Sequence, residues 1–303
     1  MKRVLMTGLS LRSLAHPSLG VIATVVTLCV AALATSGSLL AQELNGTGAD
    51  PVRSQDLFYT TSGPRPDGTE VFAIQVSGSD ITTRDVGPTN GGMCASLARS
   101  PSGALYSMCG ALFGAQQLAT IDAQTGRANL FGKQVSGLAV MAMAFSPKGT
   151  LYAVGDCNPA ADDECTHGSD PNYNSLYTVD LETGAVARIG STGAPEFFMD
   201  LAFDANGGMF GVTSTVHHSA VPAILYSIEP ATGMATKMVK LVGSNSVMGL
   251  AFSREGELYA TDWTQDPGLY LIDTATGFET AIAALPFGLS SGLELMNPPD
   301  DEH

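Results

Sequence analysis

Basic residues are scarce in this sequence, which has 14 lysines and arginines against 29 aspartates and glutamates. The deficit is larger after residue 41, because residues 1–41 contain three of the basic residues and no acidic one, which leaves a net charge of −18. Nucleic acids and anionic lipids are bound through lysine and arginine, which neutralise their phosphates. We therefore predict no nucleic-acid partner and no docking on an anionic membrane.

Three further absences narrow the fold and the chemistry. No helical periodicity of useful length is found after residue 41, and the residues there alternate with the period of strands. No pair of carboxylates has a recognised catalytic spacing, and the cysteine spacings match no zinc pattern. The sequence thus predicts an all-β protein and favours a non-catalytic role over an enzymatic one.

One unit recurs along the chain and joins an alternating apolar segment to a short turn. It reads LYTVDLETGAVARIG at 176–190 and returns as LATIDAQTG (118–126), LYSIEPATG (225–233), LYLIDTATG (269–277) and, more loosely, VFAIQVSGS (71–79). The period of two predicts a strand, and the Asp-x-x-Thr-Gly segment predicts a turn into a second strand. We interpret the acidic turn residues Asp122, Asp180, Glu229 and Asp273 as turn caps; a cation-binding ring is the alternative.

A hairpin pattern precedes three of these units, at 143–154 (MAFSPKGTLYAV), 201–212 (LAFDANGGMFGV) and 250–261 (LAFSREGELYAT). Together the two patterns predict four antiparallel strands per repeat. The second-strand anchors Leu57, Leu105, Leu151, Met209 and Leu258 lie 48, 46, 58 and 49 residues apart, a period typical of β-propeller blades. We predict five blades, or six if a degenerate one is counted.

The first predicted blade has only three strands at the start of the chain, because no LAF-type strand precedes DLFYTT at 56–61. The missing strand is found at the far end as SGLELMN, residues 291–297. Pairing of this segment with the N-terminal strands would close the ring and remove the exposed sheet edges.

The ends of the chain differ in composition from this repeat array. Lys2, Arg3 and Arg12 precede the apolar run at 21–34, which predicts a cleaved signal peptide over residues 1–41; an uncleaved anchor is the alternative. Residues 42–53 are expected to form a linker, 54–297 a single propeller domain and 298–303 a polar tail. We expect a secreted or periplasmic monomer, with no membrane insertion once the signal is removed.

Four cysteines remain after the predicted cleavage, an even number that favours disulfides in an exported chain. Cys94 and Cys109 flank a turn at equal distances and are predicted to pair across it. Cys157 and Cys165 enclose a short loop and are predicted to pair locally.

The insertion at 155–175 is the longest loop between a second and a third strand. It contains Asp162, Asp163 and Glu164, whose oxygens are the ligands that calcium accepts, together with Asp156 and His167. A calcium site is one interpretation of this loop, and a solvated acidic loop is the favoured one. No cofactor is assigned.

Further candidates lie on the same predicted face, where the loops between blades surround the channel. His217 and His218 could act as acid or base, and Asp262 and Trp263 end the second strand of the fifth blade. Trp263 could stack on a sugar, although packing between blades is the favoured interpretation. These residues, with Asp156, His167 and Asp200, form the predicted ligand face for a protein or carbohydrate.

The predicted inner strands carry two more candidates. Met141, Met199 and Met248 align at one position, which indicates core filling; copper binding by thioethers is the alternative. Asp200 is the one charge in the aligned hairpin strands, where Ala142 and Gly249 stand in neighbouring blades. It is our best candidate for a channel-lining polar group, although a hydrogen bond to an adjacent blade would also explain it.

The LYxID-x-x-TG and LAF-x-x-x-G-x-LYA patterns over residues 54–297 resemble blades of secreted bacterial propellers in the broad YVTN, NHL and quinoprotein-like repeat group. The resemblance implies the fold and leaves the activity open. Quinoproteins carry a tryptophan in each blade, whereas this chain has only Trp263, so no quinone cofactor is expected. Our leading interpretation is a secreted, non-catalytic binding module with its ligand face at the channel mouth. The alternative is a metal-dependent hydrolase or lactonase with its metal near Asp200, Asp156 or Asp262.

Overall fold

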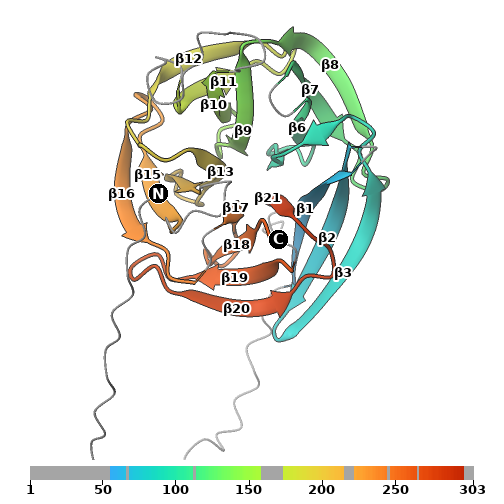
Figure 1. Cartoon of the computed structure of the whole chain (residues 1–303), viewed down its shortest axis with the longest axis vertical. Coiled ribbons are helices and arrows are strands. Elements are labelled where there is room, and N and C mark those ends of the chain that lie inside the picture. Colours follow the sequence, from blue (N-terminus) through green and yellow to red (C-terminus); the bar gives the residue numbers. More distant parts are fainter. Residues whose placement is uncertain are drawn as a thin grey trace, which may run out of the picture. The chain divides into compact units, whose positions relative to one another are not determined.

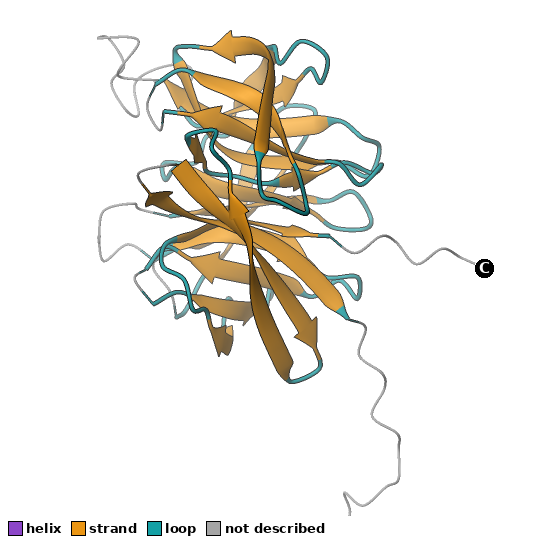
Figure 2. Cartoon of the chain, turned by 90° about the vertical axis from the view of Figure 1, so that its right-hand side faces the viewer, coloured by secondary structure: helices purple, strands orange, loops and turns teal. Residues whose placement is uncertain are grey.

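The computed structural model describes residues 55–296, except 66–67, 112–113, 158–172, 215–221, 244–245 and 265. Every described element is a strand or a loop, arranged as antiparallel sheets around a central axis (Figures 1 and 2). Within these residues no helix has the length and hydropathy that a membrane crossing requires. The prediction of an all-β propeller with five blades is confirmed.

The five sheets are named by the order in which the chain enters them. The first has the order β21 (Ser290–Leu295), β1 (Asp56–Arg65), β2 (Gly68–Ser77), β3 (Asp80–Pro88). In the second, β4 (Met93–Cys94) and β5 (Ala98–Arg99) both pair with β6 (Leu105–Gly110), followed by β7 (Gln116–Ile121) and β8 (Ala128–Val135). The third has β9 (Leu138–Phe145), β10 (Leu151–Cys157), β11 (Ser175–Val179), β12 (Val186–Ser191). The fourth has β13 (Phe198–Phe203), β14 (Met209–Thr213), β15 (Ile224–Ile228), β16 (Ala235–Lys240), and the fifth β17 (Val247–Phe252), β18 (Leu258–Asp262), β19 (Gly268–Ile272), β20 (Glu279–Ala284).

The first blade combines strands from both ends of the described chain. The C-terminal strand β21 pairs antiparallel with β1, with Phe58 opposite Leu295 and Thr60 opposite Leu293. The hydroxyls of Thr60 and Ser290 are hydrogen-bonded at 2.8 Å. Figure 1 shows the red β21 beside the blue β1 at the centre of the ring. The pairing places β1 between β21 and β2, so β1 has no free edge, and β21 becomes the innermost strand of the blade.

The Asp-x-x-Thr-Gly turns are capped as predicted and also contact the neighbouring blade. Asp180 Oδ1 accepts hydrogen bonds from the Glu182 and Thr183 backbone N–H groups and from the Thr183 hydroxyl, at 3.0, 2.7 and 2.7 Å. The hydroxyl bond of Thr183 and these backbone bonds hold the pKa of Asp180 below its ordinary value. Across the blade junction, the Lys133 N–H in β8 donates to the Thr183 carbonyl at 2.5 Å.

A glycine is needed where one of these turns packs against the outer strand of the preceding blade. A Cβ on Gly87 in β3 would lie 2.4 Å from the Thr125 carbonyl oxygen of the next blade. The φ of Gly87 is 137°, a value that side-chain-bearing residues rarely adopt. The repeat therefore specifies the contact between blades as well as the turn itself.

The anchor of the second strand in the first blade is one residue away from its predicted position. Phe58 is fully buried and lies opposite Ile74, as Leu105 lies opposite Ile121 in the second blade. Leu57, the predicted anchor, is only partly buried. Because neighbouring residues of a strand point to opposite faces, the sequence pattern placed this strand one residue out of register.

The core is divided among the spaces between blades. One buried cluster joins Leu118 of the second blade to Met143 and Tyr177 of the third. Another joins Leu176 of the third blade to Phe198 of the fourth. Each sheet therefore buries both of its faces, which explains the dense run of apolar residues in the inner and second strands.

Candidate ligand site at the channel mouth

Asp200 lies fully buried on β13 and connects inner strands of neighbouring blades. Its Oδ2 accepts hydrogen bonds from the backbone N–H groups of Leu250 in β17 and Leu293 in β21, at 2.8 and 3.1 Å. The Ser96 hydroxyl of the second blade donates to Oδ1 at 3.4 Å and accepts the Met143 N–H of β9 at 2.9 Å. Side chains or backbone from every blade thus join one network centred on this carboxylate.

The charge state of Asp200 reflects two opposing effects. Burial raises the pKa of this carboxyl well above its ordinary value, while the hydrogen bonds from Leu250, Leu293 and Leu201 lower it. Because its oxygens already accept backbone hydrogen bonds, the carboxylate acts in this structure as a junction between blades.

The channel end that precedes Asp200 along β13 is filled by a methionine cluster. Three of its members, Met141, Met199 and Met248, stand at β-bulges in β9, β13 and β17, where the register with the second strand shifts by one residue. Bulges re-aim side chains, and here they bring the thioethers together. The cluster consists of Met93, Ala95, Met141, Met199 and Met248, with Phe197 and Trp263 packed against it.

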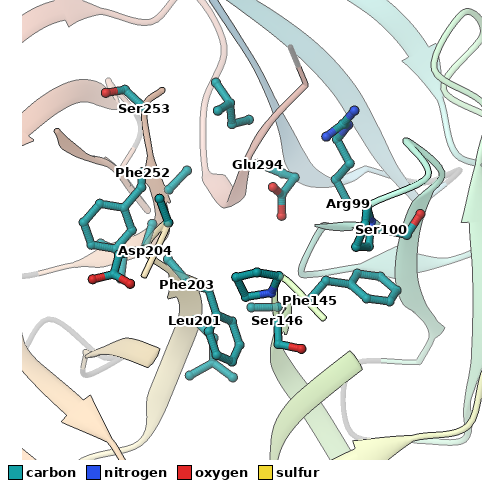
Figure 3. Close-up of a pocket in the computed structure, with 18 of the residues that line it drawn as sticks. Arg99, Ser100, Phe145, Ser146, Leu201, Phe203, Asp204, Phe252, Ser253 and Glu294 are labelled. Carbon is teal, nitrogen blue, oxygen red and sulfur yellow. The ribbon is translucent and has the colours of Figure 1, made fainter. Parts of the chain in front are cut away.

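The opposite channel end holds a cavity of about 490 Å³ (Figure 3). It is built where the inner strands end and turn into the second strands, so every blade contributes to its lining. Phe145, Phe203 and Phe252 come from three equivalent strand ends, and Leu201 and Leu250 add aliphatic surface. Arg99, Glu294, Asp204 and Arg254 are its charged residues. A cavity of this volume accommodates a small organic molecule.

Two of these charged residues depart from the repeat. The inner strands read Met-Ala-Phe at 143–145 and Leu-Ala-Phe at 201–203 and 250–252, whereas the second blade has Leu-Ala-Arg at 97–99 and the first has Leu-Glu-Leu at 293–295. Arg99 thus replaces a phenylalanine and Glu294 replaces an alanine. Figure 3 shows both on the same side of the cavity, in neighbouring blades. Our sequence analysis missed both residues, although their departure from the repeat was visible.

Glu294 is partly buried and has a raised pKa. Burial raises the pKa of Glu294 to about 8, while a backbone hydrogen bond from Arg99 and the charge of Arg99 lower it. At neutral pH this carboxyl is therefore mostly protonated and able to donate a hydrogen bond into the cavity.

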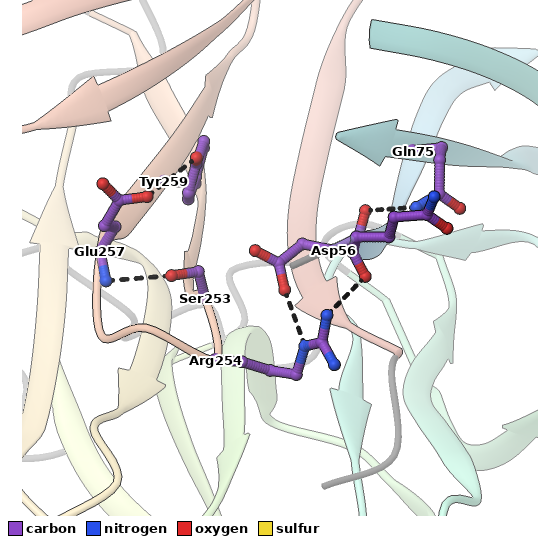
Figure 4. A network of polar contacts seen from close by, with 7 residues as sticks. Asp56, Gln75, Ser253, Arg254, Glu257 and Tyr259 are labelled. Carbon is purple, nitrogen blue, oxygen red and sulfur yellow. Dashed lines mark hydrogen bonds and ion pairs between the residues drawn. The ribbon is translucent and has the colours of Figure 1, made fainter. Parts of the chain in front are cut away.

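The two arginines of the cavity have different partners. Arg254 forms an ion pair with Asp56, with Nε and Oδ1 3.2 Å apart, and its Nη2 donates to the Gln55 carbonyl at 2.9 Å (Figure 4). Arg99 forms no ion pair among the residues that the structure describes. Arg254 is thus held against the start of β1, whereas Arg99 lines the cavity and its charge acts on Glu294.

The residues predicted for the ligand face are not gathered at this cavity. Asp156 is buried in β10, and its charge raises the pKa of Tyr173 after the larger effect of burial. Asp262 is buried at the end of β18, where its Oδ1 accepts the Gly268 N–H at 2.7 Å and Tyr270 donates to Oδ2 at 3.4 Å. Burial and then the Asp262 charge raise the pKa of Tyr270 to about 12. Trp263 packs against the methionine cluster.

The remaining predicted residues cannot be placed. His167, His217 and His218 lie outside the described residues, as do Asp162, Asp163 and Glu164 of the calcium prediction. Across the ranges that are described, no three His, Cys, Asp or Glu side chains are grouped so that they could hold a metal ion. Calcium binding by the 155–175 loop stays a prediction.

Cys94 and Cys109 form the predicted disulfide, from directly opposite positions on β4 and β6 with their Cα atoms 4.2 Å apart. Cys165 and the side chain of Cys157 lie outside the described residues, so the second pairing stays a prediction. The Cys94–Cys109 bond fixes the short strand β4 to its sheet.

Replacing Cys94 and Cys109 together with alanine is expected to lower the free energy of unfolding by about 3 kcal/mol, because the bond closes a loop of 15 residues. Urea unfolding of the variant and the oxidised wild type measures this difference. Reduced wild type should match the variant, and equal stability of all three samples would contradict a stabilising role for the bond.

These observations define a five-bladed β-propeller, the fold to which the repeats of the YVTN, NHL and quinoprotein-like group pointed. Solved structures similar to it include a gluconolactonase from Xanthomonas campestris, with 12% identity over 80% of this chain and 91% of that one and a TM-score of 0.44. Another is the calcium-binding protein regucalcin from Agrobacterium tumefaciens, with 17% identity, 79% and 77% coverage and a TM-score of 0.41. A third is the PQQ-bound aldose sugar dehydrogenase from Streptomyces coelicolor, with 13% identity, 80% and 90% coverage and a TM-score of 0.45.

No protein-family model matches the sequence, and a search of curated proteins gives no match. The three structural similarities assign no activity to this chain. Its function must therefore be argued from its own residues.

Proposed function

We propose that this protein is a non-catalytic binding module that takes a small organic group into the cavity at the channel end opposite the methionine cluster. The observation that carries the proposal is the pair Arg99 and Glu294, which replaces apolar repeat residues at the wall of a cavity of about 490 Å³. Repeat positions that serve packing alone are expected to keep apolar side chains, as they do in the other blades. We retain the prediction, made from the signal-like residues 1–41, that the protein is exported.

The chemistry of the channel supports binding over the hydrolase alternative. A metal-dependent lactonase near Asp200 or Asp262 would need carboxylate oxygens that can turn toward the ion. Asp200 Oδ2 already accepts two backbone N–H groups, and Asp262 Oδ1 accepts a third from Gly268. Rotating either side chain toward a metal would leave buried donors without an acceptor, at a cost of about 1–3 kcal/mol for each donor.

The proposal is tested by saturation-transfer NMR with a library of small organic fragments. Ala205, an exposed residue of the cavity rim, is replaced with tryptophan to fill the mouth. The Ala205→Trp variant is expected to lose fragment binding at least about tenfold, because the indole occupies the volume that the ligand needs.

The matched control is Ala231→Trp, at an exposed turn outside the cavity lining, which should bind fragments as wild type does. If no fragment binds wild type, or if both variants bind alike, the cavity is not the ligand site. Lactone hydrolysis that requires added calcium or zinc and persists in Ala205→Trp would favour the enzymatic alternative.

A further inference from the structure

We propose that the ligand of this cavity is an organic monoanion, a carboxylate on an apolar body, with Arg99 holding the anionic end. The inference rests on the binding function proposed above and specifies its ligand class. Three features of the described residues carry it: an arginine without an ion pair, a neighbouring carboxyl that can donate a hydrogen bond, and an apolar wall opposite them.

The first feature is the positive charge that Arg99 brings to the cavity. Arg99 is partly buried, and none of the described carboxylates forms an ion pair with its guanidinium. The cavity's other charges are engaged locally: Arg254 pairs with Asp56, and Asp204 Oδ1 accepts the N–H groups of Asn206 and Gly208 at 3.0 and 2.7 Å. A guanidinium in such a place binds a carboxylate through two parallel hydrogen bonds.

The second feature is the carboxyl of Glu294 on the neighbouring strand β21. With its pKa at about 8, this group is mostly neutral at pH 7, so it can donate to a ligand oxygen instead of repelling it. Burial raises this pKa, and a backbone hydrogen bond from Arg99, the Arg99 charge and a backbone hydrogen bond from Leu295 lower it. The Glu294 charge in turn raises the pKa of the buried Asp200, and Asp204 and Arg254 line the same cavity. A bound anion is thus flanked by one cation and one neutral donor.

The third feature is the apolar wall. Leu201 and Phe203 of β13 and Leu250 and Phe252 of β17 line the cavity across from the Arg99 and Glu294 strands, as Figure 3 shows for the labelled residues. Phe252 is fixed by an edge-on contact with Phe210, with the ring centroids 5.1 Å apart. Such a surface binds a hydrocarbon or aromatic ligand body, and it offers no polar contact that would stabilise a small hydrated ion.

The test uses pairs of probes that differ only in charge. Phenylacetate and octanoate are titrated into the full mature protein by calorimetry at pH 6.5, beside their primary amides and beside inorganic phosphate. Both carboxylates are expected to bind at least about tenfold more tightly than their amides, because a charge-assisted contact is lost in the amide. Phosphate, which has no apolar body, is expected to bind more weakly than either carboxylate.

The main variant, Arg99→Phe, restores a residue of the repeat, so it is expected to fold. Arg99→Phe gives the Leu-Ala-Phe sequence of the other blades and should lose at least about tenfold in carboxylate affinity while keeping amide affinity. Lys237→Met, which removes an exposed lysine of the outer strand β16, is the control of equal charge change and should bind as wild type does. Melting temperatures of all variants verify that they are folded.

The pH dependence is a separate readout. Both probe acids are ionised above pH 6, so only the protein titrates between pH 6.5 and 9. Glu294 gains a negative charge as the pH rises through about 8, and carboxylate affinity should fall over that range. In Glu294→Gln, which cannot ionise, the affinity should stay constant.

Each outcome decides between the two proposals. Amides that bind as tightly as carboxylates, or carboxylate affinity unchanged in Arg99→Phe, would overturn the monoanion and leave the binding module standing. Failure of every fragment and every probe to bind would overturn the binding function itself. Carboxylate binding that is lost in Arg99→Phe and retained in Lys237→Met supports both.

Discussion

A chain that ends at Leu289, and so lacks β21, is expected not to form a stable propeller. The deletion removes the partner of β1, the buried side chain of Leu293 and one of the N–H groups that hold Asp200. The expected loss exceeds about 5 kcal/mol, which is comparable with the whole stability of many domains. Circular dichroism during heating should show no cooperative transition, and size-exclusion chromatography should show aggregates formed through the open edge of β1.

The matched control is a chain that ends at Met296, which retains every described strand. It should melt as the protein with its full C-terminus does. If the chain ending at Leu289 unfolds cooperatively at the same temperature as this control, the pairing of β21 with β1 is not needed for the fold.

Replacing Asp200 with alanine is expected to lower the free energy of unfolding by about 4 kcal/mol. The backbone N–H groups of Leu250 and Leu293 would lose their acceptor, and each such buried donor costs about 1–3 kcal/mol. Asp200→Asn should cost less, about 2 kcal/mol, because the amide retains one acceptor oxygen. Urea unfolding monitored by circular dichroism measures both differences.

Asp180→Ala serves as the control, because Asp180 is an exposed turn cap and its loss should cost about 1 kcal/mol. A loss at Asp200 no larger than the loss at Asp180 would mean that the carboxylate does not join the blades. Asp200→Leu tests the same point by asking whether an apolar side chain of similar volume can replace the network; we expect it cannot, because the donors remain buried.

The repeat made most of the fold predictable from sequence. Strands at Leu105, Leu151, Met209 and Leu258 lie where the anchors placed them, because apolar alternation records burial directly. The slip from Phe58 to Leu57 occurred in the blade whose first strand is found at the other end of the chain. Without a preceding LAF strand there was no hairpin to fix the register of β1, and the alternation alone allowed either face.

The site was harder to predict because strand alternation does not show which end of the channel keeps an empty volume. The ligand face was expected where the loops between blades lie, whereas the cavity lies at the opposite end, where the inner strands turn into the second strands. Asp200 was singled out as the one charge in the aligned strands. The structure shows it buried and hydrogen-bonded to adjacent blades, which is the alternative explanation that the sequence analysis gave for a charge at this position. The three aligned methionines form one buried cluster, at the channel end opposite the cavity. Arg99 and Glu294 were not predicted because each lies in a blade whose inner strand matches the repeat poorly. In such a strand, a charged residue is easily taken for ordinary sequence divergence of the repeat.

The pairing of β21 with β1 has a consequence for how the chain folds as it is synthesised. The hydroxyls of Thr60 and Ser290, in contact across that pair, are 230 positions apart in sequence. While a ribosome is still making the intervening blades, β1 has no inner neighbour and its backbone donors remain available to any other extended segment nearby. Contacts between residues so far apart in sequence slow folding. We therefore expect β21 to pair with β1 only after translation has ended. Until then, the open edge of β1 must be protected from pairing with other extended segments.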